Sequence, residues 1–275
     1  MGDSLAVSEE LLVNVADGVA ILTLNRPEQH NALSRALRGA LVATLTSIAT
    51  DDRVGVVIFT GAGDKAFCAG ADFKEMEHSP LQPEELGPDA PLMRAFRELH
   101  KPTIAAINGF ALTGGFELAV NCDILVASTN ARFADTHARV GLVSAWGLTQ
   151  HLPRAIGPVR ARYLSFTGNY LDAQTALAWG LVLDVLPPDE LMPYCLGIAR
   201  DILSCDAAAL RDVREAIAHG LGAGLDAGLR FEGELARRSL ARFDVSAFVG
   251  RRAETLARGK AQAESKTAGQ RPPLP

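Results

Sequence analysis

The residues best suited to chemistry lie between Asn108 and Asp123, in the segment NGFALTGGFELAVNCD. Gly114 and Gly115 open a predicted helix, whose first backbone N–H groups have no partner within the helix and lie at the positive end of its dipole. Glu117 follows within the first turn. This pattern suits a site that stabilises a developing oxyanion beside a carboxylate. A tight strand-to-helix corner with a solvated glutamate would give the same pattern.

Two neighbouring motifs carry weaker chemical signals. The segment GAGDKA, which begins at Gly61, formally fits the dinucleotide-binding pattern GxGxxA. The residues after it continue as a loop instead of a helix, and no strand beyond it ends in an acidic residue at the usual distance, so nucleotide binding is not predicted. Cys68 has no accompanying histidine or asparagine motif, and we interpret it as a small buried thiol.

Composition excludes several classes of protein. The chain has 275 residues, of which 48% are hydrophobic and 21% charged, which is enough to bury a full core. A net charge of -5 provides no basic field for nucleic acid. Four cysteines without paired spacing indicate neither a zinc site nor a disulfide scaffold. Without an apolar run that could span a bilayer or a secretory signal, no membrane association is expected and a cytoplasmic location is predicted.

The elements that position these residues follow from hydrophobic periodicity. A hairpin is predicted over 11–24, a helix over 32–48 with Ser34 as its cap, and a buried strand over 54–59. Residues 66–76 are expected to form a connection into a short helix, followed by a mobile loop rich in proline. A last strand is predicted over 181–186. Beyond it lie helical segments at 189–205, 207–219, 222–243 and 246–260.

This pattern divides the chain into an α/β core over 1–188, a helical oligomerisation region over 189–260 and a flexible tail over 261–275. Helices with long apolar faces on a domain that is already complete commonly pack on another subunit. We therefore expect an oligomer.

Four segments in order resemble the crotonase superfamily, also called the enoyl-CoA hydratase/isomerase family: LNRPEQHNALS, AFCAGADFKEM, PTIAAINGFALTGGFELAVNCD and ARFADTHARVGL. Together they extend the resemblance over nearly the whole chain. The resemblance implies a spiral of ββα turns with a C-terminal helical trimerisation region. Members form trimers, often two trimers stacked into a hexamer.

The resemblance also implies site residues. The backbone N–H groups of Ala71 and Gly114 would form an oxyanion hole for the thioester carbonyl of an acyl-CoA. Residues 69–74 would line the groove for adenine and pantetheine, with Ala69, Asp72, Phe73 and Lys74 as substrate-binding residues. Arg26 and Lys74 are candidates to bind the CoA phosphates. The alternative interpretation of each is an ordinary solvated surface charge.

Family hydratases place two glutamates on one water molecule, and this sequence departs from that pattern. Glu117 matches the first glutamate, but His137 stands at the second position. A neutral imidazole near its normal pKa can accept or donate a proton, so His137 would replace the carboxylate or would only shape the pocket. Asp135 is a less favoured substitute. Thr113, where many members have glycine, and Ser144, where many have proline, also depart from the pattern and bear on acyl-chain preference and loop geometry.

The implied function is that of a lyase: an enoyl-CoA hydratase that adds water reversibly to a trans-2-enoyl-CoA, as in fatty acid metabolism. No metal or redox cofactor is implied, because coenzyme A arrives as part of the substrate. Two alternatives remain. One is another reaction of the family, namely double-bond isomerisation, decarboxylation or thioester hydrolysis. The other is an acyl-CoA-binding oligomer without turnover, in which Glu117 is structural.

Overall fold

Alternating apolar residues near the N-terminus form the predicted hairpin, in which β2 (Leu11–Ala16) pairs antiparallel with β3 (Val19–Leu24). The computed structural model describes residues 3–4 and 8–267. Within these residues, the main sheet has the order β1-β2-β3-β4-β6-β8-β11, and it is parallel from β3 onward. The remaining strands of this sheet are β1 (Asp3–Ser4), β4 (Val56–Gly61), β6 (Thr103–Ile107), β8 (Ile124–Ser128) and β11 (Val185–Leu186). The last strand is therefore shorter than predicted.

A second sheet of short strands was not predicted. Its order is β10-β9-β7-β5, with β5 at Ala66–Cys68, β7 at Phe110–Leu112, β9 at Arg132–Ala134 and β10 at Leu171–Asp172. Residues 66–68 were expected to be part of a loop, and that expectation was wrong. A strand of three residues is too short to show an alternating pattern, and β5 is buried throughout. Each of β5, β7 and β9 follows a parallel strand of the main sheet, so the turns of the fold repeat.

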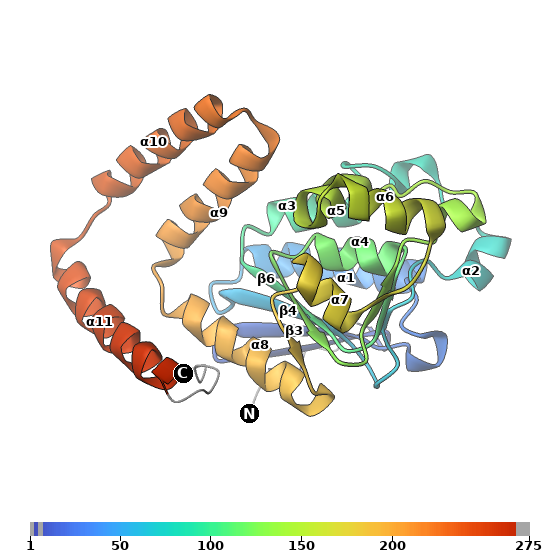
Figure 1. The fold of residues 1–275 in the computed structure, drawn as a ribbon, viewed down its shortest axis with the longest axis horizontal. Coiled ribbons are helices and arrows are strands. Elements are labelled where there is room, and N and C mark those ends of the chain that lie inside the picture. The colour runs from blue at the N-terminus through green and yellow to red at the C-terminus, as the bar shows by residue number, and fades with distance from the viewer. Residues whose placement is uncertain (1–2, 5–7, 268–275) are drawn as a thin grey trace. The chain divides into compact units, whose positions relative to one another are not determined.

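The helices of the core lie around the two sheets (Figure 1). They are α1 (Arg35–Ala49), α2 (Phe73–His78), α3 (Pro91–Glu98), α4 (Gly114–Val120), α5 (Leu148–Ile156), α6 (Pro158–Thr167), α7 (Ala173–Trp179) and α8 (Pro188–Leu203), with short 3-10 turns η1 (Pro27–Gln29), η2 (Pro83–Glu85) and η3 (His137–Val140). As predicted, Ser34 caps α1, because its hydroxyl accepts from the Leu37 N–H at 2.9 Å. Aromatic pairs join helix to strand: Phe59 stacks on Phe96, and Phe116 contacts Phe133.

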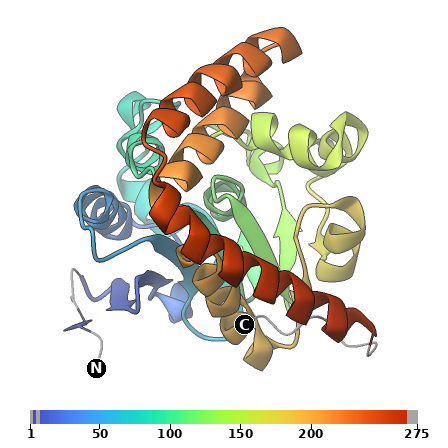
Figure 2. The ribbon, with the colours of Figure 1, turned by 90° about the vertical axis from the view of Figure 1, so that its left-hand side faces the viewer.

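The chain divides into two compact units, Met1–Ala199 and Arg200–Pro275. The second unit contains α9 (Ala207–Gly222), α10 (Leu225–Ala241) and α11 (Val245–Thr267), so the predicted helices are present. Figures 1 and 2 show α9 and α10 side by side, and the His219 ring stacks on Phe231 between them. Residues 268–275 of the predicted tail lie outside the described residues. In the part of the chain that is described, no helix combines the length and apolarity that crossing a membrane needs.

Replacing Gly115 with alanine is expected to destabilise the core. A Cβ at this position would lie 2.0 Å from the Cys68 carbonyl oxygen of β5, so strand and helix would have to separate. Overpacking of this kind costs about 1–3 kcal/mol, measurable by chemical denaturation. The matched control is Gly39→Ala, at an exposed position of α1 with open space around it, which should raise stability by about 0.5–1 kcal/mol. Equal stability of Gly115→Ala and the unmodified protein would contradict this account of the packing.

Candidate active site

The parallel pairing of β5 with β7 brings the loop after β5 beside the N-terminus of α4. A Cβ built on Gly114 would lie 3.6 Å from the Ala71 nitrogen, so the two predicted donors are close together. Within residues 3–4 and 8–267, neither the Ala71 nor the Gly114 N–H donates to a protein acceptor. Two neighbouring free N–H groups at the start of a helix are suited to hold an oxyanion.

The loop that carries Ala71 is held by the first of the four motifs. The Ala69 N–H donates to the His30 carbonyl at 3.0 Å, and the Leu33 N–H donates to the Gly70 carbonyl at 2.7 Å. The fully buried Asn31 completes this support, because its side-chain amide donates to the Ala66 carbonyl at 2.7 Å. The motif LNRPEQHNALS therefore has a structural function here: it fixes the backbone of residues 69–71.

Thr113 precedes α4 in a strained backbone conformation. Its φ of 46° lies in the region that favours glycine. Its hydroxyl donates to the Ala69 carbonyl at 3.3 Å and fills the space in which any Cβ on Gly70 would stand, 2.0 Å away. Thr113, which departs from the family pattern, thus links the loop that carries Ala71 to the start of α4, which carries Gly114.

Glu117 lies on α4 with its carboxylate buried, only 3% exposed. Oε1 accepts from the Trp146 backbone N–H at 2.6 Å, and Oε2 lies 3.4 Å from His137 Nε2. The structure therefore brings the two predicted catalytic side chains into contact. It excludes a solvated Glu117.

His137 begins η3, directly after β9, and stands between two carboxylates. Its Nδ1 lies 2.8 Å from Asp135 Oδ1, opposite the contact with Glu117. Burial lowers the pKa of His137, but hydrogen bonds to Asp135 and Glu117 outweigh it and raise the pKa to about 9. The expectation of a neutral imidazole near its normal pKa was therefore wrong, because that expectation did not include the second carboxylate. At neutral pH the ring is an imidazolium.

Three of the five predicted substrate-binding residues lie around a surface hollow, and Ala69 and Phe73 are not among the residues that line it. Arg26, Asp72 and Lys74 line a cavity of about 670 Å³. The Arg26 guanidinium is already engaged: it donates to Asp72 at 2.7 Å and pairs with Glu10 at 3.2 Å. Lys74 is exposed and has no ion pair within the described residues, Phe73 is 48% exposed, and Ala69 is half-buried. Lys74 is thus freer than Arg26 to meet a phosphate.

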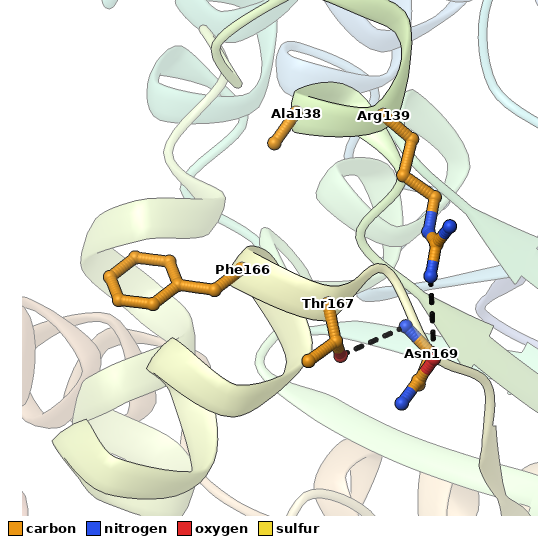
Figure 3. A pocket seen from close by; sticks show the side chains of 5 residues that line it. All are labelled: Ala138, Arg139, Phe166, Thr167 and Asn169. Atoms are coloured by element: carbon orange, nitrogen blue, oxygen red, sulfur yellow. Dashed lines mark hydrogen bonds between the residues drawn. The ribbon is translucent and has the colours of Figure 1, made fainter.

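A second pocket begins one residue after His137 (Figure 3). It has a volume of about 430 Å³ and is lined by Ala138, Arg139, Phe166, Thr167 and Asn169. Arg139 points across it toward Asn169, whose amide oxygen accepts at 3.4 Å, whereas Phe166 turns away from the other four. The residues come from η3 and from the end of α6 and the turn after it.

Sequence reasoning did not identify the contribution of Trp146. Its backbone N–H holds Glu117, its indole Nε1 donates to the Glu85 carbonyl at 2.9 Å, and its own carbonyl accepts from the Asn121 amide at 2.8 Å. The loop that contains Glu85 is tied to α1 by Arg38 at 2.8 Å. Since the contact with Glu117 is made by the main chain, no residue type could have signalled it.

Repeated strand–strand–helix turns, with paired N–H donors beside a buried carboxylate, are typical of the crotonase class of acyl-CoA enzymes. The sequence profile of the enoyl-CoA hydratase/isomerase family matches residues 14–255, and the chain belongs to that family.

Individual relatives agree with this assignment. A probable peroxisomal enoyl-CoA hydratase 1 of Arabidopsis thaliana is 40% identical over 84% of this chain and 87% of its own length. The crystal structure of an enoyl-CoA hydratase from Mycobacterium tuberculosis H37Rv is 44% identical and has a TM-score of 0.70, covering 83% of this chain and 98% of that one. One from Bacillus anthracis is 36% identical with a TM-score of 0.79, covering 90% and 96%. These matches confirm the predicted crotonase fold.

The charged state of His137 predicts a pH-dependent contribution to stability. Its pKa rises from 6.5 to about 9 on folding, so the protonated ring stabilises the fold fully below pH 6.5, and this stabilisation is lost as pH rises through 9. In urea unfolding at several pH values, the unmodified protein should have a larger free energy of unfolding than His137→Gln at low pH, and this difference should disappear as pH rises from 6.5 through 9. A constant difference between the two proteins from pH 6 to 10 would mean that the ring is not charged in the fold.

Proposed function

We propose that the protein is an enoyl-CoA hydratase, which adds water reversibly to a trans-2-enoyl-CoA thioester. The observation that carries this proposal is the contact of Glu117 Oε2 with His137 Nε2 at 3.4 Å, which joins a buried base to a half-buried acid. Hydration needs both, because water must lose a proton on attack at Cβ and Cα must gain one. Family membership and the names of the relatives support the same reaction.

The N–H groups of Ala71 and Gly114 would hold the thioester oxygen. When water attacks Cβ, electrons move onto this oxygen and form an enolate, which needs donors that are already in place. Loss of one such donor typically costs about 3 kcal/mol of barrier. Gly114 leaves room for the thioester to approach the backbone.

Glu117 and His137 would divide the proton transfers. The Glu117 carboxylate orients water and takes its proton as the C–O bond forms at Cβ. The imidazolium of His137 then gives its Nε2 proton to Cα, and the enolate collapses to the thioester. Passage of the proton from the Glu117 carboxyl group to the neutral ring restores both residues. The two atoms lie 3.4 Å apart, so this transfer proceeds once they draw slightly closer in the substrate complex or through one bridging water. The reverse sequence dehydrates the product.

Glu117→Gln should abolish hydration, because an amide cannot accept the proton of water. We expect kcat to fall about 10²- to 10⁴-fold, followed as loss of enoyl-thioester absorbance with short and long trans-2-enoyl-CoA substrates, and by mass spectrometry of the hydrated product. Glu98→Gln, at an exposed position of α3, is the matched control and should retain full activity. Hydration that persists in Glu117→Gln would remove Glu117 from the mechanism.

His137→Ala separates the two interpretations of this residue. As a proton donor, its loss should lower kcat about 10²- to 10⁴-fold with little change in KM. A residue that only shaped the pocket would mainly change KM and chain-length preference. Steady-state kinetics on both substrates distinguishes the two, and an unchanged kcat would contradict the acid role.

Binding of the nucleotide part of coenzyme A is assigned to the 69–74 segment, with Lys74 as the main phosphate contact and Arg26 acting through Asp72. We also infer a cytoplasmic homotrimer or dimer of trimers. Large apolar side chains exposed on the C-terminal helices support association, among them Ile217, Leu225, Leu229, Leu240 and Val249. No cofactor besides the coenzyme A of the substrate is proposed.

Double-bond isomerisation is the second candidate, because the matched family includes isomerases and the reaction needs the same oxyanion donors. Assaying a 3-enoyl-CoA beside the 2-enoyl-CoA decides between the two reactions. Turnover of the 3-enoyl substrate alone would replace hydration as the function. Tight binding of both without turnover would favour an acyl-CoA-binding oligomer.

A further inference from the structure

Asp135 is a buried carboxylate that the reaction described above does not use. It is 3% exposed, and its Oδ1 accepts from His137 twice, from ring Nδ1 at 2.8 Å and from the backbone N–H at 3.3 Å. Burial raises the pKa of Asp135, but hydrogen bonds from His137 and Ser165 more than offset this and hold the pKa below its usual value. Asp135 is thus an anion under the ring, on the side away from Glu117.

The backbone holds Asp135 in register with the donor pair. Asp135 directly follows β9, which pairs with β7 so that Ala134 lies opposite Leu112. The Thr113 N–H donates to the Ala134 carbonyl at 3.0 Å, one residue before Gly114 opens α4. The same strand pair therefore fixes the carboxylate that holds His137 and the helix start that carries Gly114 and Glu117.

We propose that Asp135 is a positioning residue for the reaction, which orients the His137 ring through Nδ1 so that Nε2 faces Glu117 and the reacting carbon. This inference rests on the proposed function. Asp135 does not itself exchange a proton with the substrate. It keeps Nδ1 protonated throughout the cycle, so that only Nε2 loses and regains a proton.

The charges around the ring are consistent with this role. Within the described residues, the charged groups that contact the His137 ring are Glu117 on α4 and Asp135 after β9. The α6 helix contributes Ser165, an uncharged group, to Asp135, and Arg139 on η3 is directed to Asn169. Glu117 faces the site, and Asp135 holds the ring on its opposite side.

Asp135→Asn keeps an acceptor of the same shape but removes the charge. The pH above which kcat/KM declines should then fall by about 1–3 pH units, since a neighbouring carboxylate shifts a pKa by that amount. If the pKa of His137 falls by about two units from about 9, the protonated fraction of the ring at pH 8 decreases about tenfold, and kcat/KM decreases with it. Asp212→Asn is the control, because it removes another buried carboxylate. Asp212 pairs with Arg238 on α10 and with Arg242 in the turn after α10. Its replacement should change stability without moving the pH profile.

Nitrogen NMR of labelled histidine tests the same point without turnover. The chain has six histidines, and His137→Gln assigns the signal of interest. The His137 ring should titrate near pH 9 in the unmodified protein and at clearly lower pH in Asp135→Asn, and the latter should also populate the Nδ1-deprotonated tautomer. An unchanged titration and an unchanged pH profile would overturn the inference.

The two measurements separate the proposals. If the ring titration moves in Asp135→Asn but no variant or parent hydrates an enoyl-CoA, the proposed function fails, and with it any effect of Asp135 on turnover. If the parent hydrates and Asp135→Asn shows the parent titration and pH profile, the proposed function stands and the positioning role is wrong. Activity that is lost equally at every pH, with an unmoved ring titration, would show a purely structural carboxylate.

Discussion

The first turn of α4 packs directly on the backbone of β5, and the rest of the site depends on this contact. At Gly115 there is no room for a side chain, since the Cys68 carbonyl occupies that space. The close approach places the Gly114 nitrogen beside Ala71 and leaves both N–H groups without protein acceptors in the described residues. It also buries Glu117, whose carboxylate is then held by fixed partners, the Trp146 N–H and His137, because a buried charged group needs hydrogen-bond partners. One backbone contact thus determines both the donors and the state of the base.

Hydrogen bonds from other parts of the core hold two short, irregular segments of the site in place. The segment formed by β5 and the loop after it takes its shape from His30, Asn31 and Leu33, which lie at least 35 residues earlier in the chain than the residues they hold. The Trp146 segment is held in turn by Asn121 and by the loop containing Glu85. Burial alone would not orient these groups, since polar atoms in a core need specific partners. The geometry of the site therefore depends on residues that lie outside it.

The sequence predicted the hairpin, the capped α1 helix, the start of α4 at Gly114 and the four C-terminal helices, because each has a long apolar period or a clear signal at its start. It did not predict β5, β7 and β9, whose three residues cannot display a period. The pairing of Glu117 with His137 was expected from motif positions, yet the charge on His137 was not. That charge depends on Asp135 standing on the far side of the ring, a relation in space that sequence spacing does not contain. Contacts made by main-chain atoms, as at Trp146, leave no trace in residue type.

The position of the His137 ring between two carboxylates, those of Glu117 and Asp135, has an electrostatic consequence for the substrate. With the ring protonated, the three groups sum to one negative charge, which is the same total as for two glutamates that share one proton. The developing enolate would therefore meet the same net charge, although the proposed proton donor is a cation instead of a neutral acid. The acidity of this donor does not have to depend on groups that face the reacting atoms. Here it is governed by a carboxylate behind the ring, so acid strength can vary without altering the surface that the acyl group touches.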